Sequence, residues 1–247
     1  MLEVKHVTKS FGGVKALNGV DLVLGTEKIT GILGPNGAGK STLINAITGF
    51  FPCTTGQILW NGEDISRLAP HEIARRGIVR TFQIPKYFNG ISVTDHLNIA
   101  DAARRKQEKS GSSSWRRELA TQLLENAGFG RALHSDMPIE EVGLSYWQLK
   151  VLQAATVICR GGEMLFLDEP VGGLSKAEAE ELAKAVRFVT ENGVRVCIVE
   201  HRIGWILGLA ERTVVLEQGR VIAEGTPEEI RTNQRVIDCY LGEADND

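Results

Sequence analysis

The sequence has 247 residues, enough for one large domain or two small ones, and its hydrophobic fraction of 43% can supply a sizeable core. A charged fraction of 24% and a formal net charge of −3 are ordinary for a globular protein, so no basic field indicates a nucleic-acid partner. No apolar run approaches the roughly 20 residues that span a bilayer, and the N-terminus lacks the layout of a signal peptide.

The first elements are predicted to be antiparallel strands. Leu2–Val7 and Val20–Leu24 alternate apolar and polar residues as half-buried strands do, and the turn between them carries Phe11. Further along, Asn61-Gly62 separates two strand-like runs and is the strongest two-residue hairpin signal. These segments predict an antiparallel β subdomain.

A glycine-rich loop follows the short buried strand 28–33 and precedes a helical pattern over 41–48. It fits G-x-x-x-x-G-K-[ST], the phosphate-binding loop (P-loop), with the residues Gly34, Pro35, Asn36, Gly37, Ala38, Gly39, Lys40 and Ser41. Glycines let backbone N–H groups wrap a polyphosphate, and the helix N-terminus adds partial positive charge. Lys40 can reach the terminal phosphates, and the Ser41 hydroxyl can ligate Mg²⁺. Because a strand and a helix flank the motif, a chance match is a poor explanation, and we predict binding of a nucleoside triphosphate.

The middle of the chain changes character. After a predicted helix at 70–76 and a predicted strand at 77–83, residues 86 to about 160 contain helical patterns, at 94–103 and 115–127, but no clear strand. The polar, serine-rich stretch 104–114 predicts a mobile loop, with contact to lipid headgroups by its basic residues as the alternative. This block is predicted to be a helical subdomain inserted into an α/β core.

The core resumes after this block. Its predicted elements are a strand at 163–167, a helix from Ser175 to about Glu191, a strand at 194–199, paired strands around Gln218-Gly219, and a C-terminal helix from Thr226. The four cysteines lie far apart without a C-x-x-C pair, which predicts free, mostly buried thiols in a reducing cytoplasm rather than a metal site.

Two acids and two other polar residues follow predicted core strands. Asp168-Glu169 comes after four apolar strand residues, at the sheet edge where ligands bind in open α/β folds. An aspartate there holds Mg²⁺ in P-loop NTPases, and the adjacent carboxylate can orient or deprotonate an attacking water. Gln83 and His201 also end strands and can reach the metal, the water or a phosphate. The alternative is that Gln83 and His201 are structural polar residues without a role in catalysis.

The order of these motifs resembles that of the ATP-binding-cassette (ABC) ATPases over nearly the whole chain. After the P-loop and Gln83, the series continues with Leu144-Ser145-Tyr146-Trp147-Gln148 (the signature segment), Leu167-Asp168-Glu169-Pro170, Gly173-Leu174-Ser175 and His201. The resemblance implies an α/β fold of the P-loop NTPase class. It implies one ABC-type nucleotide-binding domain over 1–247, with a mixed sheet core (1–85 and 161–247), an antiparallel β subdomain and an inserted α-helical subdomain (about 86–160).

The resemblance also implies roles for the motif residues, in two cassettes that close head to tail around ATP. The implied catalytic residues are Lys40, Gln83, Glu169 as the general base and His201 as the switch histidine. The implied ATP contacts are the P-loop residues 34–41 with Thr42, Phe11 stacked on adenine, and Ser145 and Gln148 facing the partner's ATP. The implied Mg²⁺ ligands are Ser41, Gln83 and Asp168. The alternative to adenine stacking is that Phe11 is simply a half-exposed aromatic residue in a turn between strands.

Three further segments narrow the subfamily. Residues 75–83, 224–230 and 240–243 resemble the ATPase subunits of branched-chain amino-acid importers, which predicts ATP hydrolysis coupled to import of branched-chain amino acids or a related small polar solute. Cassettes for urea or amide import and for lipopolysaccharide export share parts of these segments. The solute therefore stays open at this point.

The implied partners are those of a transporter ATPase. They are a second ABC ATPase subunit, transmembrane permease subunits and, indirectly, a substrate-binding protein, which places the chain peripherally on the cytoplasmic face of the inner membrane. The alternative is a soluble ABC ATPase that scaffolds an assembly pathway of the iron–sulfur cluster type. DNA-repair cassettes need a long coiled coil between the Walker motifs, and translation-factor cassettes carry two copies in one chain. Neither feature is present in the sequence, so no nucleic-acid partner is expected.

The signature segment departs from the family pattern at Trp147. The usual segment has two glycines, at the positions of Tyr146 and Trp147, because a close backbone approach to a phosphate favours the absence of a side chain. One hypothesis is that the chain pairs with a different, regular cassette and that only one of the two ATP sites is fast; a homodimer is the other arrangement. The alternative is that Trp147 packs against its own subdomain.

Overall fold

The computed structural model describes residues 1–106 and 114–244, and these form two compact units. Unit 1 contains Met1–Ile73 with Val196–Asp247, and unit 2 contains Ala74–Arg195. Helix α2 (Pro70–Arg75) spans the boundary between them. The expected helical subdomain, about 86–160, lies within unit 2, and the expected mobile loop falls mostly on residues 107–113, outside the described residues.

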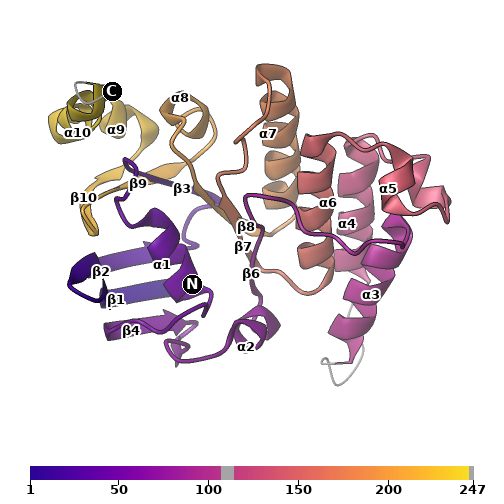
Figure 1. Ribbon diagram of the computed structural model, residues 1–247, viewed down its shortest axis with the longest axis horizontal. Helices are drawn as coiled ribbons and strands as arrows, with labels where there is room; N and C mark the ends of the chain where they lie inside the picture. The colour runs from indigo at the N-terminus through magenta and orange to yellow at the C-terminus, as the bar shows by residue number, and fades with distance from the viewer. Residues whose placement is uncertain (107–113, 245–247) are drawn as a thin grey trace. The chain divides into compact units, whose positions relative to one another are not determined.

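The antiparallel sheet of unit 1 has the strand order β2-β1-β4-β5 (Figure 1). Its strands are β1 (Leu2–Phe11), β2 (Val14–Leu24), β4 (Thr55–Trp60) and β5 (Glu63–Asp64). The sequence predicted the subdomain but made β1 and β2 too short, ending the first at Val7 and starting the second at Val20. Register shifts after Val4, Val7 and Lys9 explain this error, because each shift interrupts the two-residue alternation on which the prediction depended.

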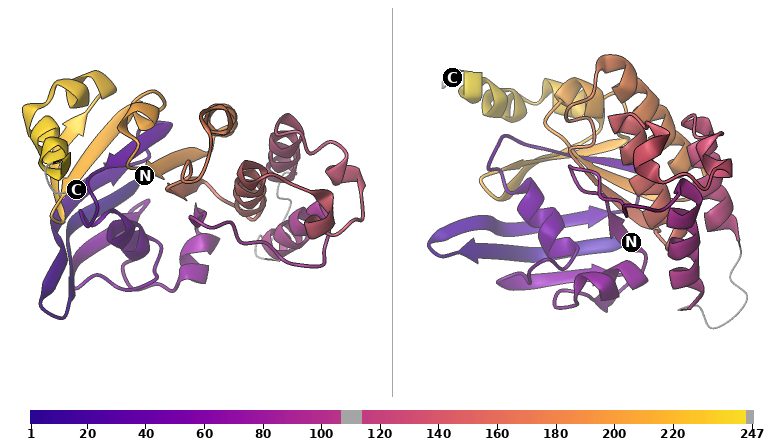
Figure 2. Two further views of the ribbon diagram at one scale, coloured as in Figure 1. Left: turned by 45° about the horizontal axis from the view of Figure 1, so that its top comes forward. Right: turned by 45° about the vertical axis from the view of Figure 1, so that its right-hand side comes forward.

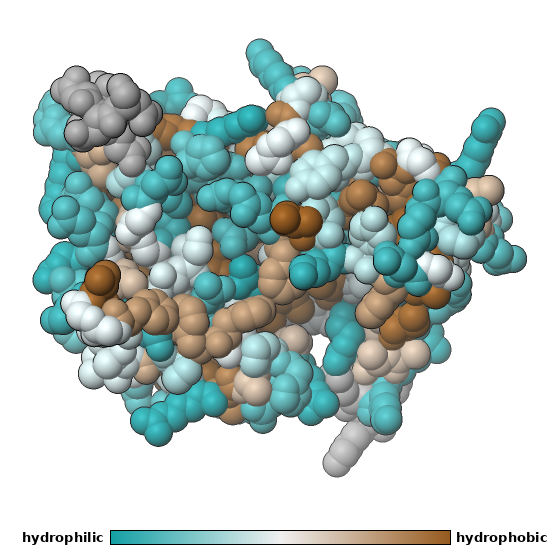
Figure 3. All heavy atoms as spheres, in the orientation of Figure 1, coloured by the Kyte–Doolittle hydropathy of each residue, from teal (hydrophilic) through white to brown (hydrophobic). Residues whose placement is uncertain are grey.

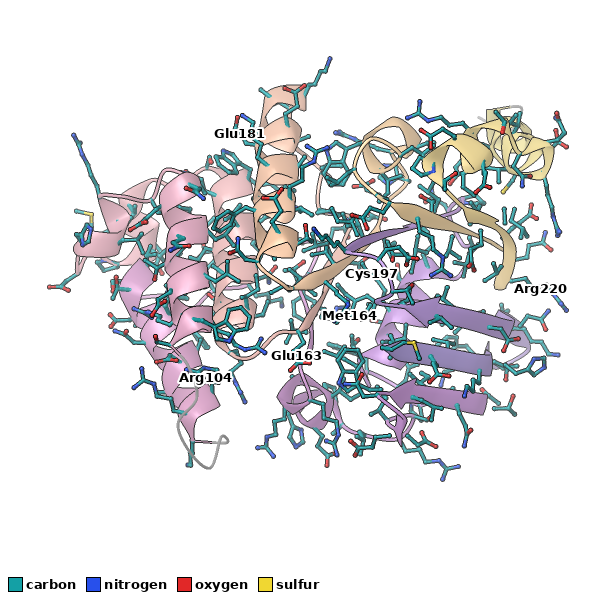
Figure 4. All side chains as sticks on the ribbon, turned by 180° about the vertical axis from the view of Figure 1, so that it is seen from behind. Arg104, Glu163, Met164, Glu181, Cys197 and Arg220 are labelled. Carbon is teal, nitrogen blue, oxygen red and sulfur yellow. The ribbon has the colours of Figure 1, made fainter. Side chains whose placement is uncertain are left out.

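The other strands of unit 1 have the order β10-β9-β3-β8. Strand β3 (Ile29–Leu33) is buried at every residue and runs parallel to β8 (Arg195–Val199) and β9 (Arg212–Glu217), while β10 (Arg220–Gly225) is antiparallel to β9. This pairing makes the sheet mixed, as predicted. Cys197 on β8, labelled in Figure 4, is fully buried, and its burial raises the pKa of the thiol. Cys53, Cys159 and Cys239 are also free thiols, of which only Cys159 is buried.

The helices of unit 1 include two that were not predicted from the sequence, the second and the last in chain order. They are α1 (Lys40–Ile47), α8 (Ile203–Ile206), α9 (Pro227–Thr232) and α10 (Gln234–Ala244). The C-terminal helix predicted from Thr226 is confirmed as α9, with Thr226 as its N-cap in a capping box with Glu229. It is followed by a separate helix, α10, because Asn233 is extended and its side-chain oxygen accepts a hydrogen bond from the Arg235 amide, 3.0 Å away. The short helix α8 was missed.

Unit 2 combines two parallel strands with a group of helices (Figures 1 and 2). The strands are β6 (Ile78–Arg80) and β7 (Met164–Asp168). The helices are α3 (Val93–Arg105), α4 (Trp115–Asn126), η1 (Ala132–His134), α5 (Ile139–Val142), α6 (Tyr146–Cys159) and α7 (Lys176–Glu191). Helices α3, α4 and α6 lie side by side and bury apolar faces that include Leu97, Leu123 and Leu152.

Two sequence predictions in unit 2 need correction. The strand expected to reach Gln83 ends at Arg80, because the Phe82 amide donates to the Gln153 side chain (3.1 Å) instead of to a neighbouring strand. Helix α6 was not predicted at all. It is apolar on more than one face, so the 3.6-residue contrast that marks a surface helix is weak.

Helix α3 also holds a buried ion pair, in which Arg104, labelled in Figure 4, donates to Asp101 at 2.6 Å. None of the helices in the described part of the chain is both long enough and apolar enough to span a bilayer.

Candidate active site

The P-loop of unit 1 lies between β3 and α1, as predicted. Lys40 is the first residue of α1 and is only 6% exposed. Its Nζ donates to the carbonyl oxygens of Gly34 (2.5 Å) and Pro35 (2.8 Å), so the ammonium is held inside the curve of the loop. The first backbone hydrogen bond of α1 runs from the Leu43 amide to the Gly39 oxygen. The amides that precede Leu43 therefore have no partner within the helix and can bind an anion.

The glycines of the loop are required by its close approach to other backbone. A Cβ on Gly34 would lie 2.2 Å from the Leu216 carbonyl oxygen, and one on Gly39 would lie 2.5 Å from that of Ala16. Both glycines also have positive φ angles. A Cβ on Gly37 would meet nothing within 4 Å, so this side of the loop is open. Ser41 is exposed and Thr42 is half-buried at the start of the helix. The loop therefore fits a polyphosphate.

Phe11 lies at the end of β1 and is 48% exposed. Its ring meets the Phe51 ring edge to face, with centroids 5.2 Å apart, and Lys9 Nζ lies 5.0 Å from its centroid. Contact with adenine through this ring stays a prediction, since the structure shows a half-exposed aromatic with protein partners of its own.

His201 follows β8 and is half exposed. The preceding residue, Glu200, is fully buried, and its Oε2 accepts hydrogen bonds from the amides of His201 (2.8 Å) and Arg202 (3.0 Å). The same oxygen lies 3.5 Å from His201 Nδ1. Glu200 therefore orients the predicted switch histidine. The sequence analysis gave Glu200 no role, although an acid directly before the histidine is visible there.

Asp168, the predicted Mg²⁺ ligand, ends β7 in unit 2 and forms an ion pair with Arg80 of β6. The guanidinium Nη2 donates to Asp168 Oδ2 at 2.9 Å, and the two side chains are 10% and 13% exposed. Arg80 pairs with Phe166 in the parallel register, and Asp168 is two residues further along, so both side chains lie on one face. Burial lowers the pKa of the Arg80 guanidinium, and the charge of Asp168 opposes this change. Sequence reasoning missed Arg80, which only the register identifies.

Glu169, the predicted general base, is paired with Gln83. The amide Nε2 of Gln83 donates to Glu169 Oε2 at 2.7 Å, although the two residues are 86 positions apart in the sequence. Glu169 has a φ angle of 45°, in the left-handed region that few residues other than glycine occupy. Such backbone strain persists where surrounding contacts fix it, and it is concentrated at functional sites. The structure thus brings together two of the residues that the sequence placed at the ends of different strands.

The signature segment begins helix α6. Ser145 is the N-cap residue in a capping box with Gln148, whose side-chain oxygen accepts from the Ser145 amide at 3.0 Å. The other end of the Gln148 amide donates to the Ala127 carbonyl oxygen at 3.0 Å. Gln148 thus has partners inside unit 2, and its predicted contact with a partner's ATP stays a prediction.

Trp147 faces a cavity of about 250 Å³ within unit 2. The cavity is lined by Leu123, Asn126, Ala127, Trp147, Glu181, Lys184, Ala185 and Phe188, which belong to α4, α6 and α7 or directly follow α4. Figure 4 labels Glu181 on α7. This position corresponds to the second of the two interpretations of Trp147, packing against its own subdomain. This position favours that interpretation, and the hypothesis of unequal ATP sites stays a prediction.

Each unit offers an oxygen donor that suits a metal held mainly by the phosphates of a ligand. Among the residues that the structure describes, no three His, Cys, Asp or Glu side chains gather to hold a metal ion by themselves. Mg²⁺ is bound in this way in phosphoryl-transfer sites, through one or two side chains and phosphate oxygens. Taken separately, unit 1 offers one hard oxygen donor of that kind, the Ser41 hydroxyl, and unit 2 offers another, the Asp168 carboxylate.

Comparison with known proteins identifies the class. A family model described as "ABC transporter" matches residues 17–172, and one described as "Branched-chain amino acid ATP-binding cassette transporter" matches residues 220–246. The chain therefore belongs to the ABC transporter family, whose ATP-binding subunits hydrolyse ATP to power transport. The predicted family and the predicted ATPase activity are confirmed.

Two named relatives are similar to this chain over nearly their whole length. The probable branched-chain amino acid transport ATP-binding protein LivG of Archaeoglobus fulgidus is 35% identical, over 100% of this chain and 97% of its own. The high-affinity branched-chain amino acid transport ATP-binding protein BraF of Pseudomonas aeruginosa is 34% identical, over 99% of this chain and 98% of its own.

Solved structures agree with the predicted fold. An ATP-binding cassette of an ABC transporter in its ADP conformation has a TM-score of 0.82 and 29% identity, with 98% of each chain covered. A nucleotide-free ATP-binding cassette has a TM-score of 0.80 and 29% identity, with 97% of this chain and 98% of that chain covered. The fold class predicted from the sequence is confirmed.

Proposed function

We propose that this chain is the ATPase subunit of an importer for branched-chain amino acids or a related small polar solute. The observation that carries the proposal is full-length similarity, at 34–35% identity, to proteins named as branched-chain amino acid transport ATP-binding proteins. The separate match of residues 220–246 to a model of that description supports it, because this segment lies outside the general ABC match. Cassettes of other transport systems share the P-loop and the signature segment, so these motifs by themselves do not identify the transported solute.

The proposed chemistry follows the roles that the ABC motifs give to these side chains. In unit 1, Lys40 and the amides that start α1 bind the phosphates of ATP, and Ser41 supplies a metal ligand. In unit 2, Asp168 supplies the acidic ligand, and Glu169 Oε2 accepts a proton from the attacking water. Gln83 holds that oxygen in place through its amide. Bound Mg²⁺ would neutralise phosphate charge in the transition state. His201 is proposed to donate to the γ-phosphate.

The proposed partners are permease subunits and a second ABC ATPase subunit, the chain lying on the cytoplasmic face of the inner membrane. Exposed apolar side chains of unit 2 support a protein partner, because the described residues include Ile84 (70% exposed), Phe88 (57%) and Met137 (46%). Figure 3 shows hydrophobic spheres among hydrophilic ones over the region of α3 and α5. A substrate-binding protein is the proposed indirect partner.

Reconstitution tests this function. The chain is purified with the membrane subunits that co-purify with it and placed in vesicles with the cognate binding protein and internal ATP. We expect uptake of radiolabelled leucine, isoleucine or valine, and we expect Lys40→Ala to abolish it. Uptake of urea or a short amide instead would change the solute class and retain the transporter role. ATP hydrolysis without any membrane subunit in the purified complex would contradict transport and favour the assembly-scaffold alternative.

A further inference from the structure

Helix α6 carries three polar side chains along one of its faces. Tyr146, Lys150 and Gln153 are spaced i, i+4 and i+7, which places them one above another along the helix. Lys150 is 6% exposed and Gln153 is 7% exposed. Burial of an ammonium and an amide is unfavourable unless each makes hydrogen bonds, so this face has a definite set of partners.

The partners of this face include the backbones of Phe82, Gln83 and Glu169. Lys150 Nζ donates to the carbonyl oxygens of Gln83 (3.1 Å) and Glu169 (3.5 Å). The Tyr146 hydroxyl donates to the same Gln83 oxygen at 3.1 Å. One turn further along the helix, Gln153 Oε1 accepts from the amide of the residue before Gln83 at 3.1 Å. One helix therefore holds Gln83 and Glu169, here called the catalytic pair, by their main chains.

The charge of Lys150 matters more here than its volume. Its Nζ lies 5.0 Å from the centroid of the Tyr146 ring, a distance at which an ammonium is attracted to the ring face. Its bond to the Glu169 carbonyl also fixes a residue whose φ of 45° is unfavourable for a side chain. An apolar residue of similar length would fill the space but would leave these carbonyl groups without the ammonium.

We propose that Lys150 and Tyr146 are positioning residues for ATP hydrolysis, which set the geometry of the Gln83 amide against Glu169 Oε2. The proposal rests on the proposed function, in which Glu169 is the general base. The two residues touch the backbone and not the reacting atoms. Their loss therefore lowers turnover by displacing Gln83 and Glu169, while nucleotide binding, which depends on the P-loop of unit 1, stays unchanged. The signature helix of a chain thus acts on that chain's own catalytic pair.

The size of the effect follows from the contacts. Tyr146→Phe removes one hydrogen bond of about 0.5–1.5 kcal/mol, so we expect turnover to fall about 3- to 10-fold. Lys150→Met removes the bonds to two carbonyl groups and is expected to lower turnover about 10- to 100-fold, the range for a displacement of about 1 Å at a catalytic group. Lys150→Arg keeps a charged donor and is expected to recover part of that loss.

The experiment uses the transporter complex and compares kcat with the dissociation constant for a fluorescent ATP analogue. The control is Lys176→Met, at an exposed position where α7 of unit 2 begins. We expect lower kcat with an unchanged dissociation constant for the two α6 variants only. Hydrogen–deuterium exchange of the peptide that contains residues 82–84 gives a second readout, and we expect it to become faster in the same two variants.

The possible failures are distinguishable. Unchanged kcat in both α6 variants, with an active wild type, overturns the positioning role and leaves the proposed function intact. Equal losses of kcat, nucleotide affinity and resistance to urea also overturn it, since that pattern is a general structural defect. A wild-type complex that neither binds nor hydrolyses ATP overturns the proposed function, and the positioning role falls with it.

Discussion

In unit 1 the P-loop is one continuous run of residues, and the Lys40 ammonium is held by carbonyl groups five and six positions away. In unit 2 the catalytic pair joins Gln83 to Glu169 across 86 positions, and a third segment, helix α6, holds both by their main chains. A continuous motif carries its geometry in local backbone angles, so it forms wherever its strand and helix form. The catalytic pair depends on the packing of several elements, so substitutions outside any motif can alter it.

The largest expected effect tests the catalytic pair itself. Glu169→Gln removes the proton acceptor and is expected to lower kcat about 10²- to 10⁴-fold, the contribution of a general base. The dissociation constant for ATP should stay within about threefold, because unit 1 is untouched. Steady-state hydrolysis and a nucleotide titration measure both, with Glu180→Gln on exposed α7 surface as the control. Full activity of the Glu169 variant would mean that another group takes the proton.

The Arg80–Asp168 ion pair tests whether unit 2 depends on long-range packing. Arg80→Gln leaves Asp168 without its buried partner and is expected to lower the free energy of unfolding by about 3 kcal/mol, near the lower limit for breaking a buried pair. Urea unfolding measures it. Adding Asp168→Asn should recover part of the loss, because no uncompensated charge then remains. If the losses of unfolding free energy from the two substitutions simply add in the double variant, the interaction between Arg80 and Asp168 does not stabilise the protein.

A substitution in the P-loop tests nucleotide binding by unit 1. Lys40→Ala removes charge-assisted contacts worth about 1.5–3 kcal/mol, so nucleotide affinity should fall about 10- to 100-fold. Titration with a fluorescent ATP analogue measures the change. Lys28→Ala, at an exposed position just before β3, is the control and should bind normally. Undiminished affinity in the Lys40 variant would remove the basis for placing the phosphates at this loop.

Trp147 gives the smallest expected effect on activity. Trp147→Ala enlarges the cavity beside α4 and α7 and should lower the free energy of unfolding by about 2 kcal/mol, less than for a fully buried aromatic residue. ATP turnover should stay within about twofold. Turnover that changes strongly while urea resistance stays constant would support the hypothesis of unequal ATP sites.

Sequence reasoning was most successful where the determinants are local. The glycines of the P-loop, the hairpin at Asn61-Gly62 and the capping box at Ser175 each depend on residues within a few positions of one another, and each is present in the structure. It was less successful where partners are remote. Helix α6 was missed because its apolar residues are not confined to one face, and β6 was made too long because the Gln153 side chain replaces a strand partner at Phe82.

The sequence by itself determined the ABC family, the P-loop and the candidate acids Asp168 and Glu169, since these are encoded in short motifs whose order is highly specific. Only the tertiary structure decided that Arg80 pairs with Asp168 and that Lys150 holds the main chains of Gln83 and Glu169. The physical reason is that strand register and helix packing bring together residues far apart in the sequence. Neither is encoded within a single motif.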